Sequence, residues 1–322
     1  MDVTIIIVNW NSLPCLRQCL ASIGGLKRKG EVIVIDSASF DGSAEAVRTE
    51  FPAVRFIQSE RNLGFAVANN RAAAEASGDY LLFLNPDTEI DDGAVERLLD
   101  VASAREDAGV VGPMLLNTDR SIQRTCIRAI PTIANKLLDS DLARWAWPRS
   151  SLWGMRPLFD GGLEPREVEA VSGACLMLRR DVFESVGGFS EEFFMYAEDM
   201  DLAYKVRKAG FRSYYVPEAR VVHHGGTSSR QAVSAFAAVM MSEATWRFFA
   251  MRRGRVYAMA YRVGMLCFSI LRLLLLSVAL PGWSVGRWRR SLGRSLFKWV
   301  AIFKWSIGRD GLVRRFYADP HA

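Results

Sequence analysis

Residues 80–87 have the sequence YLLFLNPD, an unbroken apolar run that stops at a polar turn. Consecutive apolar residues that end in a turn are typical of a strand buried on both faces, as in a parallel sheet covered by helices. The proline stiffens the turn. We therefore expect the carboxylate of Asp87 to project from the edge of the sheet at which this strand ends.

Apolar runs of the same kind alternate with helix-like stretches through the first hundred residues. The predicted strands are residues 3–8, 31–35, 54–58 and 80–84, and the predicted helices are residues 13–23, 43–50, 64–77 and 93–105. This alternation predicts an α/β fold with a mostly parallel central sheet and helices on both faces. Ligands of such sheets bind beyond the carboxyl ends of the strands, which is where Asn9, Asp36 and Asp87 stand.

The second half of the chain is less regular at first. Residues 118–168 are rich in Trp and Pro, and we interpret them as a lid or an acceptor-side insertion. The patterns then predict a strand at 171–179, helices at 180–186 and 197–209, and a strand ending at 221–224. From residue 232 onward, apolar stretches interleaved with cations predict helices.

The composition excludes several classes of protein. With 322 residues, of which 50% are apolar and 24% charged, the chain is neither disordered nor a small module. Its five cysteines form no CxxC pair, which argues against a disulfide scaffold and a structural zinc site. The first apolar run is short and lacks a basic segment before it, so we expect no targeting signal and a cytosolic setting.

The net charge of +6 is unevenly distributed along the chain. Residues 251–322 contain fourteen Arg and Lys against two acids, a net charge of +12, which leaves −6 for residues 1–250. A strongly basic tail indicates an anionic partner, either a membrane or a nucleic acid. No nucleic-acid-binding motif is present, and the acidic first part would repel phosphate backbones, so the membrane is favoured.

Two stretches of the tail suggest membrane-associated helices. Residues 263–280 are apolar except for Arg272 and two serines, which favours an interfacial or buried helix over a spanning one. On a helix over residues 285–304, the apolar residues of one face are Val285, Trp288, Leu292, Leu296, Trp299 and Phe303, and the cations roughly opposite are Arg287, Arg290, Arg294 and Lys298. This pattern predicts a helix lying in an anionic membrane surface. The alternative is a helix docked on the catalytic domain.

Two acids follow predicted strands and are candidate site residues. Asp87 could hold Mg²⁺ or Mn²⁺, which prefer oxygen ligands and share phosphate oxygens, or it could simply cap the next helix. Asp36 could accept hydrogen bonds from a base or a ribose, or it could be a turn residue. The sequence NWNSLP at residues 9–14 lacks the glycines that a dinucleotide-binding dehydrogenase or a Walker A nucleotide site requires after its first strand.

Three acids, Glu198, Asp199 and Asp201, stand within four residues at the start of a predicted helix. Carboxylates are stabilised at a helix N-terminus, which is the structural alternative to a catalytic role. Glu198 and Asp201 share a face of the helix, whereas Asp199 points elsewhere. This division suits one carboxylate as a general base and the others as groups that hold a substrate or an arginine.

His223 and His224 are two of only three histidines and stand where an apolar strand ends. Neighbouring strand residues face opposite ways, so only one of the two can point into a given site. A histidine with a carboxylate is a mixed ligand set compatible with Mn²⁺ or Mg²⁺. A strand-end histidine with a structural role is the alternative.

Taken together, these segments resemble the family 2 glycosyltransferases with the GT-A fold, especially their rhamnosyltransferase-like branch. The similar segments, in order, are residues 3–11 (VTIIIVNWN), 34–43 (VIDSASFDGS), 61–66 (RNLGFA) with Asn69 and Asn70, 84–87 (LNPD), 172–174 (SGA), 187–189 (GGF), 194–202 (FMYAEDMDL) and 223–226 (HHGG). Ser37 replaces the usual Asn of the second segment, and Asn85 replaces the first Asp of the DxD metal motif. The resemblance covers roughly residues 1–230.

The resemblance implies a role for each matching residue. The residues that it implies for nucleotide binding are Val8, Asn9, Asp36, Asn62, Gly64 and Asn85. Among them, Asp36 would accept a hydrogen bond from the imide N–H of uracil or thymine. The metal ligands are Asp87 and one histidine, with His223 preferred and His224 left open. Asp199 is the base that deprotonates the acceptor hydroxyl, and the further acceptor-side residues are Gly173, Ala174, Glu198 and Asp201.

We therefore expect an inverting glycosyltransferase that depends on Mg²⁺ or Mn²⁺. Its expected donor is a dTDP- or UDP-sugar, best dTDP-rhamnose, and its acceptor is a lipid-linked glycan of cell-envelope polysaccharide synthesis. The expected parts are a GT-A domain over residues 1–230 and a basic helical region over 231–322, peripheral on the cytoplasmic face of the plasma membrane. The alternatives are a sugar-nucleotide pyrophosphorylase and a non-catalytic nucleotide-sugar-binding protein on a degenerate transferase fold.

Overall fold

A computed structural model describes residues 2–25, 30–225, 235–278, 286–309, 311 and 313. It divides into two compact units: unit 1 comprises Met1–Ile130, Ser140–Glu191 and Glu198–Thr227, and unit 2 comprises Pro131–Asp139, Glu192–Ala197 and Ser228–Ala322. The boundary proposed from the sequence, between residues 230 and 231, lies outside the described residues, as does Gly226 of the HHGG segment.

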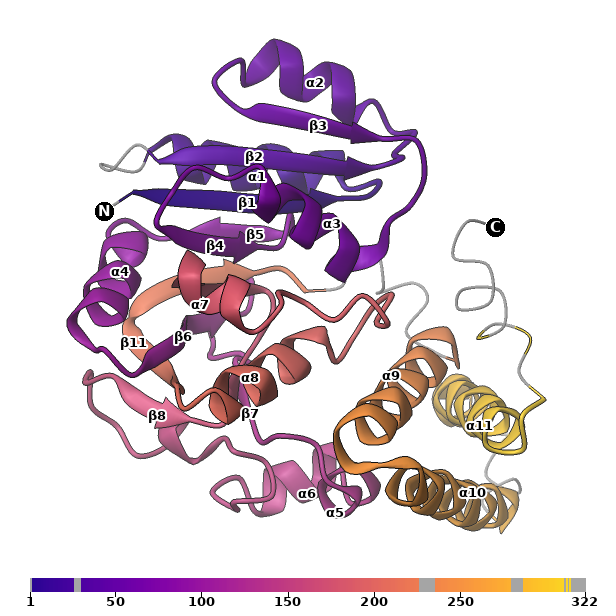
Figure 1. Ribbon diagram of the computed structural model, residues 1–322. Coiled ribbons are helices and arrows are strands. Elements are labelled where there is room, and N and C mark those ends of the chain that lie inside the picture. The colour runs from indigo at the N-terminus through magenta and orange to yellow at the C-terminus, as the bar shows by residue number, and fades with distance from the viewer. Residues whose placement is uncertain are drawn as a thin grey trace. The chain divides into compact units, whose positions relative to one another are not determined.

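Unit 1 is built on a central sheet, in which the described residues form nine strands in the order β3-β2-β1-β4-β10-β6-β11-β5, with β8 beside β11 (Figure 1). The strands are β1 (Val3–Asn9), β2 (Glu31–Ser37), β3 (Arg55–Ser59), β4 (Tyr80–Leu84), β5 (Thr88–Ile90), β6 (Ala108–Leu116), β8 (Arg166–Val168), β10 (Cys175–Arg179) and β11 (Arg212–His223). The α/β fold is confirmed. The YLLFL run is β4, and all of its residues are buried, as expected for a central strand.

The sheet is mixed. β3, β2, β1 and β4 pair in parallel, and so do β6 and β11. β10 is antiparallel to both β4 and β6, and β5 is antiparallel to β11. β10 begins at Cys175, directly opposite Leu84, the last residue of β4, and runs back along that strand. The parallel alternation of the first half therefore does not continue into the second.

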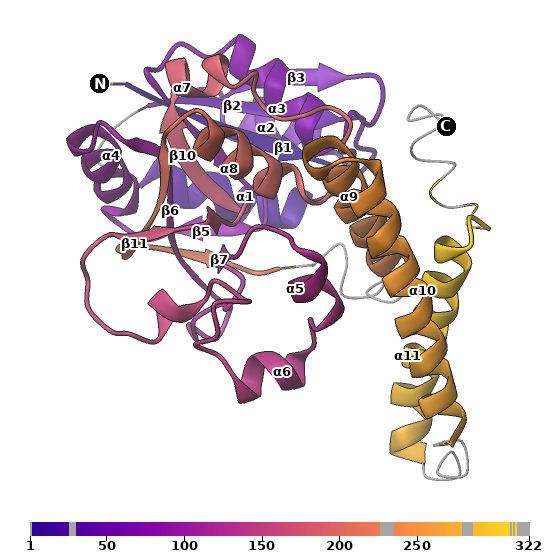
Figure 2. The ribbon, with the colours of Figure 1, turned by 60° about the horizontal axis from the view of Figure 1, so that its bottom comes forward.

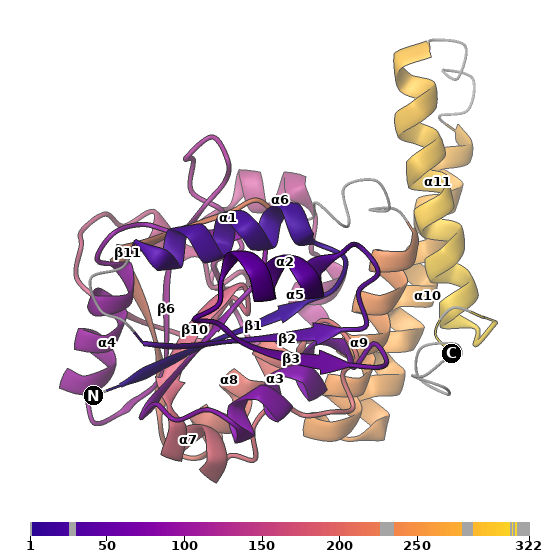
Figure 3. The ribbon, with the colours of Figure 1, turned by 90° about the horizontal axis from the view of Figure 1, so that it is seen from above.

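Helices cover both faces of this sheet. They are α1 (Leu13–Gly24), α2 (Ser43–Glu50), α3 (Gly64–Ala74), α4 (Ala94–Ala104), α7 (Arg180–Ser185) and α8 (Glu198–Lys208). Figure 3 shows α1 and α2 on one face and α3, α7 and α8 on the other. Side chains such as Ile6, Ile33 and Phe83 are fully enclosed between the layers. Each contributes roughly 1.5–3 kcal/mol through the apolar surface it removes from water.

The sequence patterns did not predict β6. Its sequence, AGVVGPMLL, has glycine and proline in its centre, and both weaken a strand signal. Gly112 is required by packing, because a Cβ at this position would lie 2.6 Å from the Cβ of Val171. Between β6 and β10, unit 1 contains β7 (Ile127–Arg128) paired with β9 (Ala170–Val171), the short helix α6 (Asp141–Ala146) and the 3₁₀ turn η1 (Arg156–Leu158).

Unit 2 is helical and contains α5 (Ile133–Leu137), α9 (Ala235–Arg253), α10 (Arg255–Val278) and α11 (Gly286–Ser306). α10 and α11 lie side by side (Figure 2). Their contacts run in opposite chain directions: Arg262 Nη2 donates to the carbonyl of Trp305 at 2.7 Å, and the rings of Phe268 and Trp299 lie 5.5 Å apart. Trp305 is buried, and its Nε1 donates to Glu243 Oε2 on α9 at 2.9 Å.

This packing involves the apolar face predicted for residues 285–304. The described residues of the expected apolar face of α11 are half-buried, and Trp299 packs on α10 instead of facing outward. Val285 and the side chains of Arg287, Trp288 and Arg290 lie outside the described residues. Amphipathic periodicity shows that a helix has an apolar face but does not show what covers it.

The exposed apolar face belongs to α10. Its exposed large apolar residues are Val256, Met259, Val263, Ile270, Leu271, Leu274, Leu275 and Val278. Their spacing places them on one side of the helix. Arg262 and Arg272 turn to α11 instead, where the Arg272 guanidinium lies 5.8 Å from the centre of the Trp299 ring. Within the described residues, α10 is the one helix long and apolar enough to cross a membrane, which by itself is weak evidence for a span.

Candidate active site

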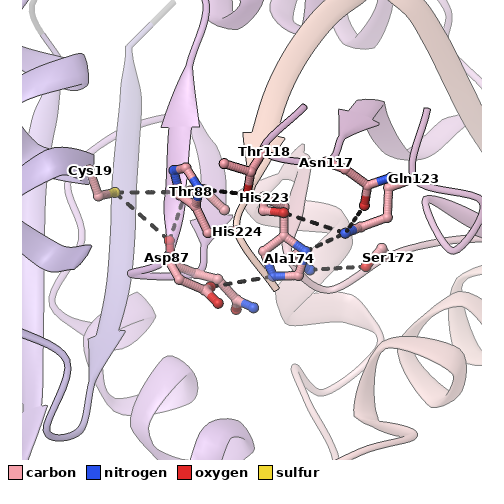
Figure 4. Close-up of polar contacts among 11 residues, drawn as sticks. Cys19, Asp87, Thr88, Asn117, Thr118, Gln123, Ser172, Ala174, His223 and His224 are labelled. Carbon is pink, nitrogen blue, oxygen red and sulfur yellow. Dashed lines mark hydrogen bonds and ion pairs between the residues drawn. The ribbon is translucent and has the colours of Figure 1, made fainter. Parts of the chain in front are cut away.

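Asp87 and His223 come together because β5 follows Asp87 directly and pairs with the end of β11, where His223 is opposite Thr88. The backbone N–H of His224 donates to the carbonyl of Asp87 at 2.9 Å, which extends the pairing of β5 and β11 by one hydrogen bond. His223 Nε2 then lies 3.3 Å from Asp87 Oδ1 (Figure 4). Both side chains are largely buried, at 16% and 13% exposure. Two residues 136 positions apart in the sequence thus form one pair at the sheet edge.

His224 points away from this pair, as strand alternation requires. Its Nε2 is 2.6 Å from Glu89 Oε1, and its Nδ1 is 3.2 Å from Thr118 Oγ1. Both ring nitrogens are therefore engaged by neighbouring side chains. Of the two histidines that the sequence left open, the geometry brings His223 and not His224 to Asp87.

The turn that carries Asp87 is held by its backbone. Asn85 N donates to the carbonyl of Ala174 at 2.9 Å, and the Asn85 carbonyl accepts from Thr88 Oγ1 at 2.7 Å. Cys19 Sγ also lies against this carbonyl, at 3.8 Å. Burial raises the pKa of the Cys19 thiol to about 12, so this side chain is neutral and inert beside the turn. The loop at Ala174 therefore fixes the position of Asp87.

The donors at this edge suit a divalent cation. A carboxylate oxygen and an imidazole nitrogen each about 2.1 Å from one ion would be separated by roughly 3 Å, close to the observed 3.3 Å between Asp87 Oδ1 and His223 Nε2. The described residues contain no group of three His, Cys, Asp or Glu side chains placed to hold a metal. A cation held here would therefore take its remaining ligands from water and substrate phosphate, as Mg²⁺ commonly does.

Asp36 and Asn9 form a buried polar pair at the ends of β2 and β1, which the parallel register places side by side. Neither side chain is exposed. Asn9 Nδ2 donates to Asp36 Oδ2 at 2.8 Å, while Asp36 Oδ1 accepts from Gln58 Nε2 and from the backbone N–H of Ser39, both at 2.8 Å. The carboxylate is thus fixed by three donors. The register pairs Asp36 with Gln58, so the position of Gln58 follows from the strand alignment.

The other residues predicted to bind the nucleotide include Val8, Asn62 and Gly64, which lie at the same edge of the sheet. Val8 is half-buried in β1 and is paired with Ile35 in the register of the sheet. Asn62 Oδ1 accepts from the backbone N–H of Gly64 at 3.0 Å. Gly64 opens α3 with a φ of +69°, a conformation that favours glycine. Asn62 and Gly64 therefore fix the entry into α3.

Asp199 is fixed by the loop that also holds the Asp87 turn. The backbone N–H of Gly173 donates to Asp199 Oδ2 at 2.9 Å, and the N–H of Met200 donates to Oδ1 at 2.8 Å. A Cβ on Gly173 would lie 3.2 Å from the Asp199 Cβ, so a larger residue would crowd this contact. Gly173 thus positions Asp199 while its neighbour Ala174 positions the Asp87 turn, and one loop connects the two halves of the site.

The other two acids of the cluster are enclosed by protein. Asp201 is fully buried, accepts from Ser190 Oγ at 2.6 Å and lies 4.0 Å from Lys205 Nζ, so its contacts are structural. Glu198 is also buried, and no donor among the described residues reaches its Oε2. Burial, with the adjacent charge of Asp199, raises the pKa of Glu198 to about 8. The folded protein therefore favours the protonated form of Glu198.

The sequence patterns also missed Gln123, in the stretch interpreted as irregular. Its Oε1 is 2.8 Å from His223 Nδ1, on the side of the ring away from Asp87 (Figure 4). Nothing in the spacing of a single sequence connects residues one hundred positions apart, so no signal was available to find this contact.

Comparisons with known proteins agree with the fold. The family model described as "Glycosyl transferase family 2" matches residues 4–187, and one described as "Glycosyl transferase family group 2" matches residues 164–307. An N-acetylglucosaminyl-diphospho-decaprenol L-rhamnosyltransferase of Mycobacterium tuberculosis is 35% identical over 239 residues, which cover 70% of this chain and 76% of the relative. Rhamnosyltransferase WbbL of Escherichia coli is 26% identical over 200 residues, covering 59% and 71%.

Solved structures share the architecture at low sequence identity. Mannosyltransferase PcManGT from Pyrobaculum calidifontis, in complex with GDP-Man and Mn²⁺, superposes with a TM-score of 0.58 at 16% identity, over 96% of this chain and 86% of that one. GalNAc-T7 with UDP, GalNAc and Mn²⁺ gives a TM-score of 0.54 at 16% identity, over 78% and 51%.

The fold and the placement of the site define the class of the molecule, a glycosyltransferase with the GT-A fold. The chain belongs to glycosyl transferase family 2 and is similar to its rhamnosyltransferases.

Proposed function

We propose that this glycosyltransferase moves L-rhamnose from dTDP-rhamnose to a hydroxyl of a lipid-linked glycan, in the synthesis of cell-envelope polysaccharide. The observation that carries the proposal is the loop at Gly173 and Ala174, which holds the Asp87 turn with one residue and Asp199 with the next. The identity to a transferase named for a rhamnosyl group and a diphospho-decaprenol acceptor supports the choice of substrates.

The donor would lie along the carboxyl edge of β1, β2 and β4. Asp36, held by Asn9 and Gln58, keeps a carboxylate where the imide N–H of a pyrimidine base can donate to it. Asp87 and His223 would hold Mg²⁺ or Mn²⁺ on the donor diphosphate. A bound cation supplies charge stabilisation for the departing nucleoside diphosphate. The Mn²⁺ in the related structures supports this assignment.

Asp199 would be the general base. The acceptor hydroxyl gives its proton to the Asp199 carboxylate while its oxygen forms a bond to the anomeric carbon. The bond from that carbon to the diphosphate oxygen breaks on the opposite face, and the electron pair leaves with the nucleoside diphosphate. This single displacement inverts the anomeric configuration. Glu198, protonated by its burial, leaves the basic role to Asp199.

A panel of donors tests the substrate assignment. With Mn²⁺ and a polyprenyl-diphosphate-linked GlcNAc acceptor, we expect dTDP-rhamnose to give an inverted glycosidic product and UDP-glucose or GDP-mannose to give little, measured by mass spectrometry and NMR of the anomeric proton. A preference for another donor would overturn the sugar assignment but keep the transferase. Pyrophosphate-dependent release of a sugar phosphate would instead favour a pyrophosphorylase. Donor binding without turnover would favour a non-catalytic binding protein.

We also propose that unit 2 attaches the enzyme to an anionic bilayer, peripherally and on the cytoplasmic face. The exposed apolar stripe of α10 extends over Val256–Val278, about 33 Å of helix at 1.5 Å per residue. A stripe of this length with no charged side chain on it suits insertion into a membrane interface. The +12 charge of residues 251–322 supports anionic lipid as the partner.

Vesicle sedimentation of the full-length protein tests this attachment. Replacing Leu271, Leu274 and Leu275 by Gln is expected to lower binding to both phosphatidylglycerol and neutral phosphatidylcholine vesicles, because these side chains supply apolar area. Replacing the exposed Lys298 and Lys304 of α11 by Gln is expected to weaken only the preference for the anionic vesicles. Unchanged sedimentation of the leucine variant would contradict α10 as the lipid-facing surface.

A further inference from the structure

The ring of His223 is held from both sides. Its Nε2 faces Asp87 Oδ1 at 3.3 Å, and its Nδ1 faces Gln123 Oε1 at 2.8 Å (Figure 4). A neutral imidazole has one N–H and one unprotonated nitrogen, and only the unprotonated nitrogen can bind a metal. Which nitrogen carries the proton therefore decides whether His223 can bind a metal ion together with Asp87.

The hydrogen bonds of Gln123 determine the orientation of its amide. Its Nε2 donates to Asn117 Oδ1 at 3.2 Å and to the backbone carbonyl of His223 at 3.4 Å. The Asn117 amide is oriented in turn, because its Nδ2 donates to Ser121 Oγ at 2.9 Å. Gln123 N also donates to the Leu115 carbonyl at 2.8 Å, which ties the residue to β6. With Nε2 committed to two acceptors, Oε1 is the amide atom that faces His223.

An amide oxygen can only accept a hydrogen bond, so the nitrogen 2.8 Å away must donate. The proton of a neutral His223 therefore lies on Nδ1, and Nε2 is left unprotonated on the side of Asp87.

We propose that Gln123 is a positioning residue, which holds His223 in the Nδ1–H tautomer so that Nε2 can bind a divalent cation together with Asp87. The inference rests on the proposed metal-binding role of the Asp87–His223 pair. Metal-bound histidines characteristically donate their second N–H to a carbonyl or carboxylate, and loss of that partner lowers metal affinity by about 10–100-fold.

The tautomer can be observed in the metal-free, full-length protein. Long-range ¹H–¹⁵N correlation spectra at pH 8 distinguish protonated from unprotonated ring nitrogens. The chain has three histidines, and His223→Ala and His224→Ala variants assign their signals. We expect His223 to be Nδ1-protonated in the wild type and to shift toward the Nε2–H form in Gln123→Leu. A wild-type ring protonated on Nε2 would overturn the proposal.

Mn²⁺ affinity, measured by electron paramagnetic resonance of free Mn²⁺, is the second readout. Gln123→Leu is expected to weaken binding by about 10–100-fold, whereas Gln123→Glu, which keeps an acceptor for Nδ1 but cannot donate to Asn117, should lose less. Thr118→Val is the matched control, because it removes a partner of His224 and should change nothing. Equal losses in the Leu and Glu variants would overturn the proposal and indicate a structural role.

The two proposals can be separated by the His223→Ala variant. If His223→Ala weakens Mn²⁺ binding and Gln123→Leu does not, only the role of Gln123 is overturned. If neither variant weakens it, the proposed metal pair fails and the role of Gln123 fails with it. Thermal unfolding of each variant shows whether a loss of affinity reflects a loss of fold.

Discussion

Replacing Asp199 by Asn is expected to lower the rate of sugar transfer by about 10²–10⁴-fold, the usual contribution of a positioned general base. Asn has nearly the same shape and keeps one acceptor oxygen for the two backbone N–H groups, of Gly173 and Met200, that donate to the two carboxylate oxygens of Asp199. It cannot take the proton of the acceptor hydroxyl. The loss should therefore appear in kcat at saturating donor and acceptor, and thermal unfolding of the variant measures the cost of the hydrogen bond that Asn cannot accept.

Glu198→Gln is the matched control, since it makes the same change from a carboxyl group to an amide at the adjacent residue. Because burial favours the protonated form of Glu198, its replacement by a neutral amide should leave most of the transfer activity intact. If Glu198→Gln lost activity as severely as Asp199→Asn, or if Asp199→Asn retained full activity, the assignment of the base to Asp199 would be wrong.

The same substitution has a predicted pH dependence of stability. In the unfolded chain Glu198 ionises near its ordinary pKa of 4.5, whereas the folded protein raises that pKa to about 8. As the pH rises between these values, the unfolded state loses its proton first, so the free energy of unfolding of the wild type decreases. Gln does not ionise. The melting temperature of Glu198→Gln should therefore exceed that of the wild type by more at pH 8 than at pH 5.

The first half of the fold was predictable because its signals are local. Strands buried on both faces, such as β1 and β4, are continuous apolar runs, and their ends place Asn9, Asp36 and Asp87 at one edge. β6 was not predictable in this way, since Gly112 is there for a close approach to Val171 that only the folded chain reveals. A local sequence pattern shows which residues are buried, but it does not show which element packs against them.

The site and the tail show the same limit. The pairing of Asp87 with His223 depends on the antiparallel register of β5 and β11, and the contact of Gln123 with His223 depends on the position of β6 beside β11. Neither is encoded in the spacing of residues. On α11, periodicity predicted an apolar face correctly, but Trp299 uses that face to pack on Phe268 of α10. The row of exposed large apolar residues lies on the neighbouring helix, α10.

Removal of the proposed metal ligands is the second change with a large expected effect. Asp87→Asn and His223→Ala should each lower transfer on the order of 10³-fold at fixed Mn²⁺, because a cation on a leaving diphosphate supplies several kcal/mol of charge stabilisation. Raising the Mn²⁺ concentration should restore part of the activity of His223→Ala, which retains the carboxylate. Treatment of the wild type with EDTA should abolish transfer reversibly.

His224→Ala distinguishes this expectation from a general loss of structure at the strand end. His224 is adjacent in sequence, equally close to the end of β11, and hydrogen-bonded to Glu89 and Thr118 instead of facing Asp87. Its removal should leave the Mn²⁺ dependence of the rate unchanged. If His224→Ala shifted the Mn²⁺ concentration for half-maximal rate and His223→Ala did not, the metal would be bound on the other face of β11. Full activity of the wild type in EDTA would argue that Asp87 and His223 act on the diphosphate without a cation.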